Sequence, residues 1–134
     1  MGSMASELAV FGETASSAEG RKPPSRPVDL VHLSRYTLGE RDLEREVLEL
    51  FCTQSTIYIE RLRAARSDKD WKDAAHSLKG SASANGAWRA AAAAERAEAL
   101  SGQALTEARA LRLGEIEASV REAETYIGTL LEDR

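Results

Sequence analysis

Residues 67–86, SDKDWKDAAHSLKGSASANG, decide the fold of this chain, because their apolar positions recur with the period of an α-helix. Ser67 is a typical helix N-cap, and Asp70 places a carboxylate in the first turn. Asn85 and Gly86 form a pair that ends helices. The stretch therefore predicts a helix from about residue 68 that packs one side into a core. The residues expected on that side are Trp71, Ala74, Ala75, Leu78, Ala82 and Asn85.

The other side of this helix is polar and carries a histidine. At 100° per residue, His76 lies roughly 150° from the middle of the core arc, so we expect it to face solvent. The residues that fall in the same outward sector are Lys69, Lys72, Lys79, Gly80 and Ser83. The sequence thus predicts an imidazole, a cation and a position without a side chain on one exposed face.

The remaining chain also reads as helices. Residues 29–36 predict a short first helix, with Asp29 near its start. Residues 41–65 predict a long, well buried helix. Its apolar stripe comprises Leu43, Val47, Leu50, Phe51, Tyr58 and Leu62, widened by Leu48, Ile57 and Ile59.

Residues 87–100 predict an alanine-dense helix stopped by Ser101-Gly102. Residues 106–131 predict a last helix with a heptad seam of Leu113, Ile116, Val120, Ala123, Ile127 and Leu130.

Short connections between these helices favour antiparallel neighbours. We therefore expect an all-α fold, an antiparallel up-down four-helix bundle with a short additional N-terminal helix, over residues 28–134. The seam of the last helix suits a coiled-coil dimer as well, but we favour the intramolecular bundle and a monomer. Residues 1–27 hold all three prolines and predict a flexible tail, in which residues 1–3 resemble a vector remnant before Met4.

Composition excludes several classes of function. The 43% apolar, 30% charged and 5% aromatic residues suit a helical protein, and a net charge of -4 argues against a nucleic-acid partner. No apolar run approaches the roughly 18 residues needed to cross a bilayer, so we expect no membrane association. Cys52 is the single cysteine, which excludes an internal disulfide and a cysteine-rich metal site and suits a reducing cytoplasm.

The chemistry concentrates at His76. A neutral imidazole has a free lone pair at cytoplasmic pH and can attack phosphorus. Lys79, one turn along, is placed to stabilise the negative charge of a transferring phosphoryl group. Gly80 costs the helix about 1 kcal/mol relative to alanine, and it clears space beside His76 for a partner's aspartate. Singly, an exposed histidine or lysine is most often plain surface, so only the combination indicates a phosphoryl site.

The segment His76-Ser77-Leu78-Lys79-Gly80-Ser81-Ala82, with Asn85-Gly86-Ala87 after it, resembles the signature of the histidine-containing phosphotransfer (Hpt) domains of bacterial phosphorelays. The resemblance implies a phosphocarrier in which His76 is phosphorylated, Lys79 stabilises the phosphate and Gly80 gives clearance. The Ala97-Glu98 step resembles the usual Leu-Glu step, which makes Glu98 a candidate to orient the imidazole. Ala90, Ala93 and Ala97 depart from the family, where larger apolar residues are common.

The resemblance also implies the partners. His76 would accept a phosphoryl group from a receiver-domain aspartate or a hybrid kinase and relay it to a response regulator. The docking surface would include Lys72, Gly80 and Ser83, together with Leu38, Leu43 and Val47 unless these three are core residues, the reading that we favour. No glycine-rich nucleotide loop and no magnesium-binding acidic pair accompanies His76, so we expect no cofactor or metal in this protein and Mg²⁺ only in the partner receiver.

Two other functions fit the same helices. A non-catalytic helical adaptor would bind receiver or kinase domains through this face, but it would need neither His76 nor Lys79. The dimerisation and phosphoacceptor element of a sensor kinase usually has an acidic residue after the histidine, where this chain has Ser77. The other histidine, His32, is expected to be a surface or helix-packing residue, and Trp71 and Trp88 are expected to be core or hinge anchors.

Overall fold

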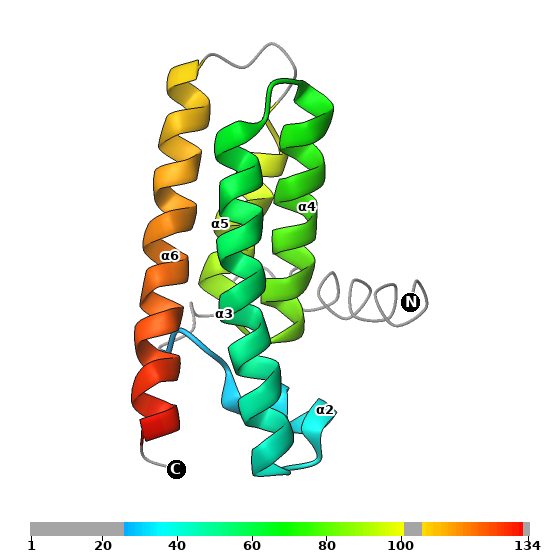
Figure 1. Ribbon diagram of the computed structural model, residues 1–134, viewed down its shortest axis with the longest axis vertical. Coiled ribbons are helices and arrows are strands. Elements are labelled where there is room, and N and C mark those ends of the chain that lie inside the picture. The colour runs from blue at the N-terminus through cyan, green and yellow to red at the C-terminus, as the bar shows by residue number, and fades with distance from the viewer. Residues whose placement is uncertain (1–25, 101–105, 133–134) are drawn as a thin grey trace, which may run out of the picture.

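The computed structural model describes residues 26–100 and 106–132, and these residues form helices and no strand (Figure 1). A short helix, α2, precedes four longer ones. Their bounds are α2 Leu30–Thr37, α3 Arg41–Ala64, α4 Asp68–Ala84, α5 Trp88–Glu98 and α6 Thr106–Glu132. The predicted all-α fold is confirmed.

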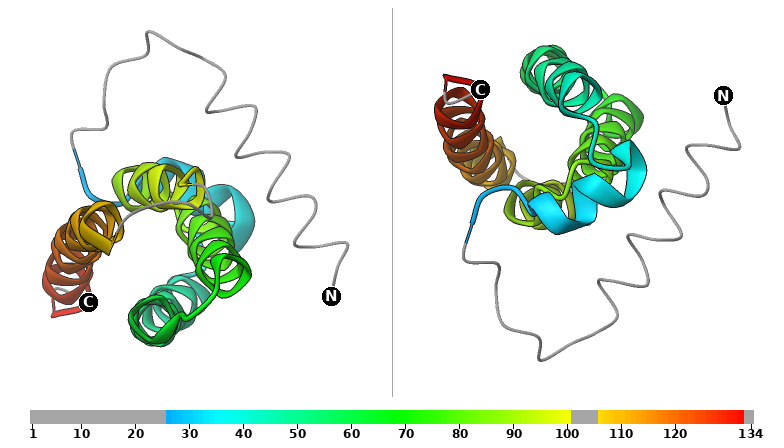
Figure 2. Two further views of the ribbon diagram at one scale, coloured as in Figure 1. Left: turned by 90° about the horizontal axis from the view of Figure 1, so that it is seen from above. Right: turned by 90° about the horizontal axis from the view of Figure 1, so that it is seen from below.

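The four longer helices run side by side along one axis, and α2 lies at the end of the bundle where α3 begins (Figure 1). Each long helix contacts its neighbours in chain order, and α3 also contacts α6. The end-on views in Figure 2 show α3, α4, α5 and α6 arranged in that order around the bundle axis. This is the predicted antiparallel four-helix bundle with a short additional N-terminal helix.

Helix α4 has the predicted start and the predicted core side. The Ser67 hydroxyl oxygen accepts the backbone N–H of Asp70 at 3.0 Å and so caps the helix. All six residues expected in the core are buried, namely Trp71, Ala74, Ala75, Leu78, Ala82 and Asn85. The other side of α4 is thereby left to solvent, which is where the candidate site lies.

Helix α3 buries only part of the predicted stripe: Leu48, Phe51, Ile59 and Leu62 are buried as expected. The buried row is Glu44, Leu48, Phe51, Ser55, Ile59 and Leu62. Leu43, Leu50 and Ile57 were expected in the buried stripe, but all three are exposed, Leu50 by 55%. Apolar residues of α3 form two adjacent rows, and the neighbouring helices cover only one of them. Hydrophobicity alone does not distinguish the two rows, so the prediction was wrong for these three residues.

Helix α5 is narrow because its inner side is alanine. Its buried residues are Ala90, Ala91, Ala93, Ala94 and Ala97. Small side chains let helix backbones approach closely, and α5 contacts both α4 and α6. The helix ends at Glu98 rather than at Leu100 as predicted, and the predicted stop at Ser101-Gly102 lies outside the described residues.

The seam of α6 faces the inside of the bundle. Ile116, Val120, Ala123 and Ile127 are buried, and Leu113 and Leu130 pack against the core at its two ends. The seam is thus used within the chain, as we favoured over a coiled-coil dimer. Polar contacts also join α6 to α3, since the Arg45 guanidinium donates to the Leu131 carbonyl at 3.1 Å and Arg63 pairs with Glu117.

Asp29 stabilises the turn between α4 and α5 through hydrogen bonds. Its backbone N–H donates to the Gly86 carbonyl at 2.8 Å, and its carboxylate accepts the Trp88 indole N–H at 3.0 Å. The same carboxylate accepts the backbone N–H of His32 at 3.1 Å and caps α2. The rings of His32 and Trp88 meet edge to face with centroids 4.7 Å apart. His32 is therefore a helix-packing residue and Trp88 an anchor, as expected.

The prediction that Ser83 faces solvent was wrong, because this part of α4 lies against α2. Ser83 was expected in the outward sector of α4, but it is only 8% exposed. His32 of α2 lies against this part of α4: burial lowers the pKa of His32, and interactions with Asp29 and with the backbone of Ser83 and Ala84 oppose that shift. Helical arithmetic on α4 alone could not include this cover from a helix that precedes it in the chain.

The predicted flexible tail falls almost wholly on residues 1–25, which lie outside the described residues. Within the described ranges, no helix combines the length and the apolar content that crossing a membrane requires.

Two glycines with positive φ allow the turn at Gly86 to be tested against a matched control. Gly86 has φ +73°, and a Cβ there would lie 2.7 Å from the Asp29 carbonyl oxygen. Gly39 has φ +78° and open space around it. We expect Gly39→Ala to lower the free energy of unfolding by about 1–2 kcal/mol, the cost of left-handed backbone for alanine. Gly86→Ala should lower it clearly more, because the Asp29 contact must also shift.

Urea unfolding followed by circular dichroism measures both losses. An equal decrease in the free energy of unfolding for the two variants would contradict the role of Asp29 in stabilising this turn.

Candidate functional site

His76 lies in the middle of α4, on the solvent side of the helix, and its side chain is 68% exposed. Its Nδ1 atom is 2.9 Å from Oε2 of Glu98, the last residue of α5. The Glu98 side chain is 30% exposed. The contact spans two helices, so the relative placement of α4 and α5 determines the environment of the imidazole.

The Glu98 contact distinguishes the two ring nitrogens. An ionised carboxylate only accepts hydrogen bonds, so Nδ1 of the neutral ring carries the proton and donates a hydrogen bond to Glu98. The lone pair is then on Nε2, and Nε2 makes no hydrogen bond with a described residue. His76 accordingly presents one nucleophilic nitrogen on an open surface.

The two lysines near His76 have different electrostatic surroundings. Lys79, one turn further along α4, is partly buried and forms no ion pair with any residue of the described ranges. Lys72, one turn before His76, lies 3.8 Å from the Asp68 carboxylate, which also pairs with Arg109 at 3.5 Å. Of the two lysines, Lys79 therefore has the less compensated charge.

Gly80 leaves space on the His76 side of α4. A Cβ built at Gly80 would meet no heavy atom within 4 Å. Packing among the described residues therefore does not require a glycine at this position. A glycine in a helix interior costs about 1 kcal/mol, and contacts with the described residues do not account for that cost.

An exposed apolar row of α3, formed by Leu43, Leu50 and Ile57, runs beside the edge of α4. Gln54 of α3, which lies between Leu50 and Ile57, accepts a hydrogen bond from Ser81 of α4 at 3.4 Å. Leu38 and Leu43 are exposed and Val47 is partly buried, so the core alternative was wrong for the first two. A macromolecular partner that covers α4 and the adjacent exposed side of α3 would therefore also meet apolar side chains.

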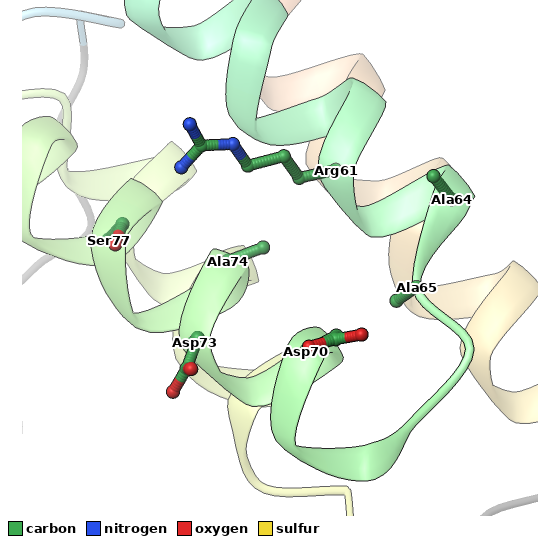
Figure 3. A pocket seen from close by; sticks show the side chains of 7 residues that line it. All are labelled: Arg61, Ala64, Ala65, Asp70, Asp73, Ala74 and Ser77. Carbon is green, nitrogen blue, oxygen red and sulfur yellow. The ribbon is translucent and has the colours of Figure 1, made fainter.

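A hollow of about 360 Å³ lies between the end of α3 and the start of α4, and Arg61 extends over it (Figure 3). Its lining residues are Arg61, Ala64, Ala65, Asp70, Asp73, Ala74 and Ser77. His76 is not among them, although Ser77 is its neighbour. Small-molecule sites are concave, so an exposed His76 that lines no such hollow suits a protein partner better than a small ligand. In the described ranges, no group of three metal-ligating side chains comes together.

Trp71 connects the two helices beneath the site, a link that sequence analysis missed. The residue is 2% exposed, as expected of a core anchor, and its indole N–H donates to the Ala97 carbonyl at 2.8 Å. A buried indole normally needs an acceptor, which was the available signal. Which group accepts this hydrogen bond depends on how α4 packs against α5, and the sequence pattern does not contain that information.

Comparison with protein families places this geometry in context. The profile of the Hpt domain matches residues 46–132, a range that includes His76, Lys79, Gly80 and Glu98. Neither curated proteins nor solved structures gave a match to the chain. The match covers more than half of the sequence and agrees with the helical bundle. The chain therefore belongs to the Hpt domain family, whose members are phosphocarriers in the histidine phosphotransfer of phosphorelays.

Proposed function

We propose that His76 accepts a phosphoryl group from the aspartate of a receiver domain, or from a hybrid kinase, and relays it to a response regulator. The observation that supports this most directly is the exposed imidazole with Nδ1 held by Glu98 at 2.9 Å. That contact leaves Nε2 as the nucleophile. The proposal takes the general activity of the family and assigns it to particular atoms of this chain.

In the proposed reaction, the Nε2 lone pair attacks the phosphorus of an aspartyl phosphate. The N–P bond forms as the P–O bond to the aspartate breaks, and the aspartate leaves as a carboxylate with the bonding electron pair. The ring keeps its Nδ1 proton and becomes cationic, so the Glu98 carboxylate stabilises the phosphorylated ring. The reverse steps return the phosphoryl group to the aspartate of a second receiver.

Lys79 and Gly80 assist this transfer in different ways. The equatorial oxygens of a transferring phosphoryl group carry negative charge, and Lys79, which has no ion pair with a described residue, can stabilise it. Gly80 leaves the space through which the receiver's aspartate approaches. Glu98 acts as a positioning residue, because it touches the imidazole rather than the phosphoryl group.

The receiver supplies the rest of the active centre in this proposal, namely the aspartate and its Mg²⁺. Its docking surface on this protein comprises Lys72, His76, Lys79 and Gly80, edged by the apolar row Leu43, Leu50 and Ile57. Ser83 is omitted because it is buried. We place this exchange in the cytoplasm, with the protein acting as a monomer.

Replacement of His76 tests the phosphoacceptor assignment. Incubation of this protein with a phosphorylated receiver should produce an acid-labile, alkali-stable phosphate, and His76→Gln should abolish it because glutamine has no nucleophilic nitrogen. Radiolabel transfer measures the phosphate, and circular dichroism checks that the helicity is unchanged. Label on the His76→Gln protein would contradict the assignment. If the wild-type protein binds the receiver but acquires no phosphate label, the adaptor alternative is favoured.

Lys79 and Lys72 form a matched pair of variants. Lys79→Ala should slow phosphotransfer roughly tenfold, the size of effect expected for one charge-assisted interaction with the transferring group. Lys72→Ala should slow it less, because Lys72 is already paired with Asp68. Single-turnover transfer rates and receiver affinities are measured for both. A Lys79→Ala loss that is equal in rate and affinity would assign Lys79 to docking instead.

Gly80 allows a size series at one position. Gly80→Ala fits the open space and should stabilise the helix by about 1 kcal/mol, while Gly80→Leu should fold but obstruct the receiver. Thermal unfolding measures stability, and transfer from a phosphorylated receiver measures function. An unaffected rate for Gly80→Leu would refute the clearance role.

A further inference from the structure

We infer that Trp71, clamped by Arg109, is a positioning residue for the phosphotransfer site. It holds the end of α5 in place, and with it the Glu98 carboxylate that orients His76. The inference rests on the proposed function for its biological meaning. The physical link itself can be measured without any phosphoryl transfer.

The link begins inside the bundle, one and a half turns before His76 on α4. The Trp71 indole N–H donates to the Ala97 carbonyl at 2.8 Å, and the ring is 2% exposed. A buried hydrogen bond of this kind is not weakened by competing water. It ties α4 to the residue that immediately precedes Glu98.

The Ala97 carbonyl belongs to the turn that closes α5. It also accepts the backbone N–H of Leu100 at 3.2 Å, and the N–H of Ala99 donates to the Glu95 carbonyl at 3.0 Å. Glu98 therefore lies within a turn whose backbone is joined to Trp71 on one side. Helix ends tend to fray, so the last residue of a helix holds a fixed position only when its turn is tied down.

The surface contact needs such support because it is exposed. His76 is 68% exposed and Glu98 is 30% exposed, and in such a pair water competes for both partners. A contact of this kind orients the imidazole well only if the backbone that carries the carboxylate is already in place. Trp71 supplies that preorganisation from the buried side of the same two helices.

Arg109 of α6 holds the indole from another side. Its guanidinium carbon lies 5.3 Å from the centroid of the Trp71 ring, and its Nη2 is 3.5 Å from the Asp68 carboxylate at the start of α4. A guanidinium over an indole is a favourable cation–π contact. Trp71 is thus in contact with α5 and α6 at once, and movement of its ring would be resisted by both.

The decisive variant is Trp71→Phe, which keeps an aromatic ring and removes the N–H donor. Its matched control is Trp88→Phe, which also removes one indole hydrogen bond, but at the first residue of α5 and to Asp29. The readout is the tautomer ratio of His76, measured from imidazole ¹⁵N chemical shifts about two pH units above the reference histidine pKa of 6.5. His32 reports on the fold of Trp71→Phe in the same spectra, whereas in Trp88→Phe it changes locally because its ring packs against Trp88.

We expect the wild-type protein and Trp88→Phe to share a His76 ratio that favours the proton on Nδ1, and Trp71→Phe to lose part of that preference. Its transfer rate should fall about threefold to tenfold, the effect of one lost hydrogen bond. In a Glu98→Ala background, Trp71→Phe should cause no further change in the ratio. An unchanged ratio in Trp71→Phe, or an equal change in the Glu98→Ala background, would overturn the inference.

If Trp71→Phe does not fold, Arg109→Gln decides instead, because it leaves the indole in the core and removes the contacts of Arg109 with the ring and with Asp68. A shift of the His76 ratio in the same direction would support the inference, and no shift would overturn it. Failure of the proposed function has a different signature: a wild-type protein that accepts no phosphoryl group, whatever the tautomer ratios show.

Discussion

The close packing of α5 on α4 is the constraint on which the rest of this structure depends. Alanines at 90, 93, 94 and 97 give α5 a buried side with almost no bulk, so its backbone can approach its neighbours. As a result a carboxylate at the end of α5 reaches an imidazole in the middle of α4, and Glu98 and His76 meet at 2.9 Å. The small side chains of α5 thus contribute to the geometry of this contact.

The site combines order with exposure, two properties that usually conflict. Burial would fix the His76 ring, but it would also close the surface to a protein partner. In this bundle the exposed His76 and the partly buried Glu98 are accompanied by a second contact between the same two helices, the buried hydrogen bond from Trp71 to Ala97. The buried Trp71–Ala97 hydrogen bond fixes the two helices, and the His76–Glu98 contact lies at the surface, so the imidazole can be oriented without being covered.

Sequence patterns predicted the parts of this arrangement that lie within one helix. The N-cap at Ser67, the core side of α4 and the exposure of His76 follow from local propensity and helical period, and all are present. The failures involve contacts between helices. Ser83 is covered by α2, and the row containing Leu50 faces solvent because its neighbours cover the adjacent row. The Trp71–Ala97 bond depends on helix placement, which a single-helix pattern does not encode.

The exposed setting also bears on how tightly the proposed carrier would hold its phosphoryl group. A partly buried carboxylate and a partly buried lysine interact with a phosphate at the protein surface, where one ion pair contributes about 0–1 kcal/mol. The bundle therefore stabilises a phosphorylated His76 only modestly relative to a free phosphohistidine. A carrier must release the group as readily as it accepts it, and a deep, strongly binding pocket would prevent release. The open face of α4 suits transfer in both directions, because most of the stabilisation during transfer would come from whichever receiver is docked.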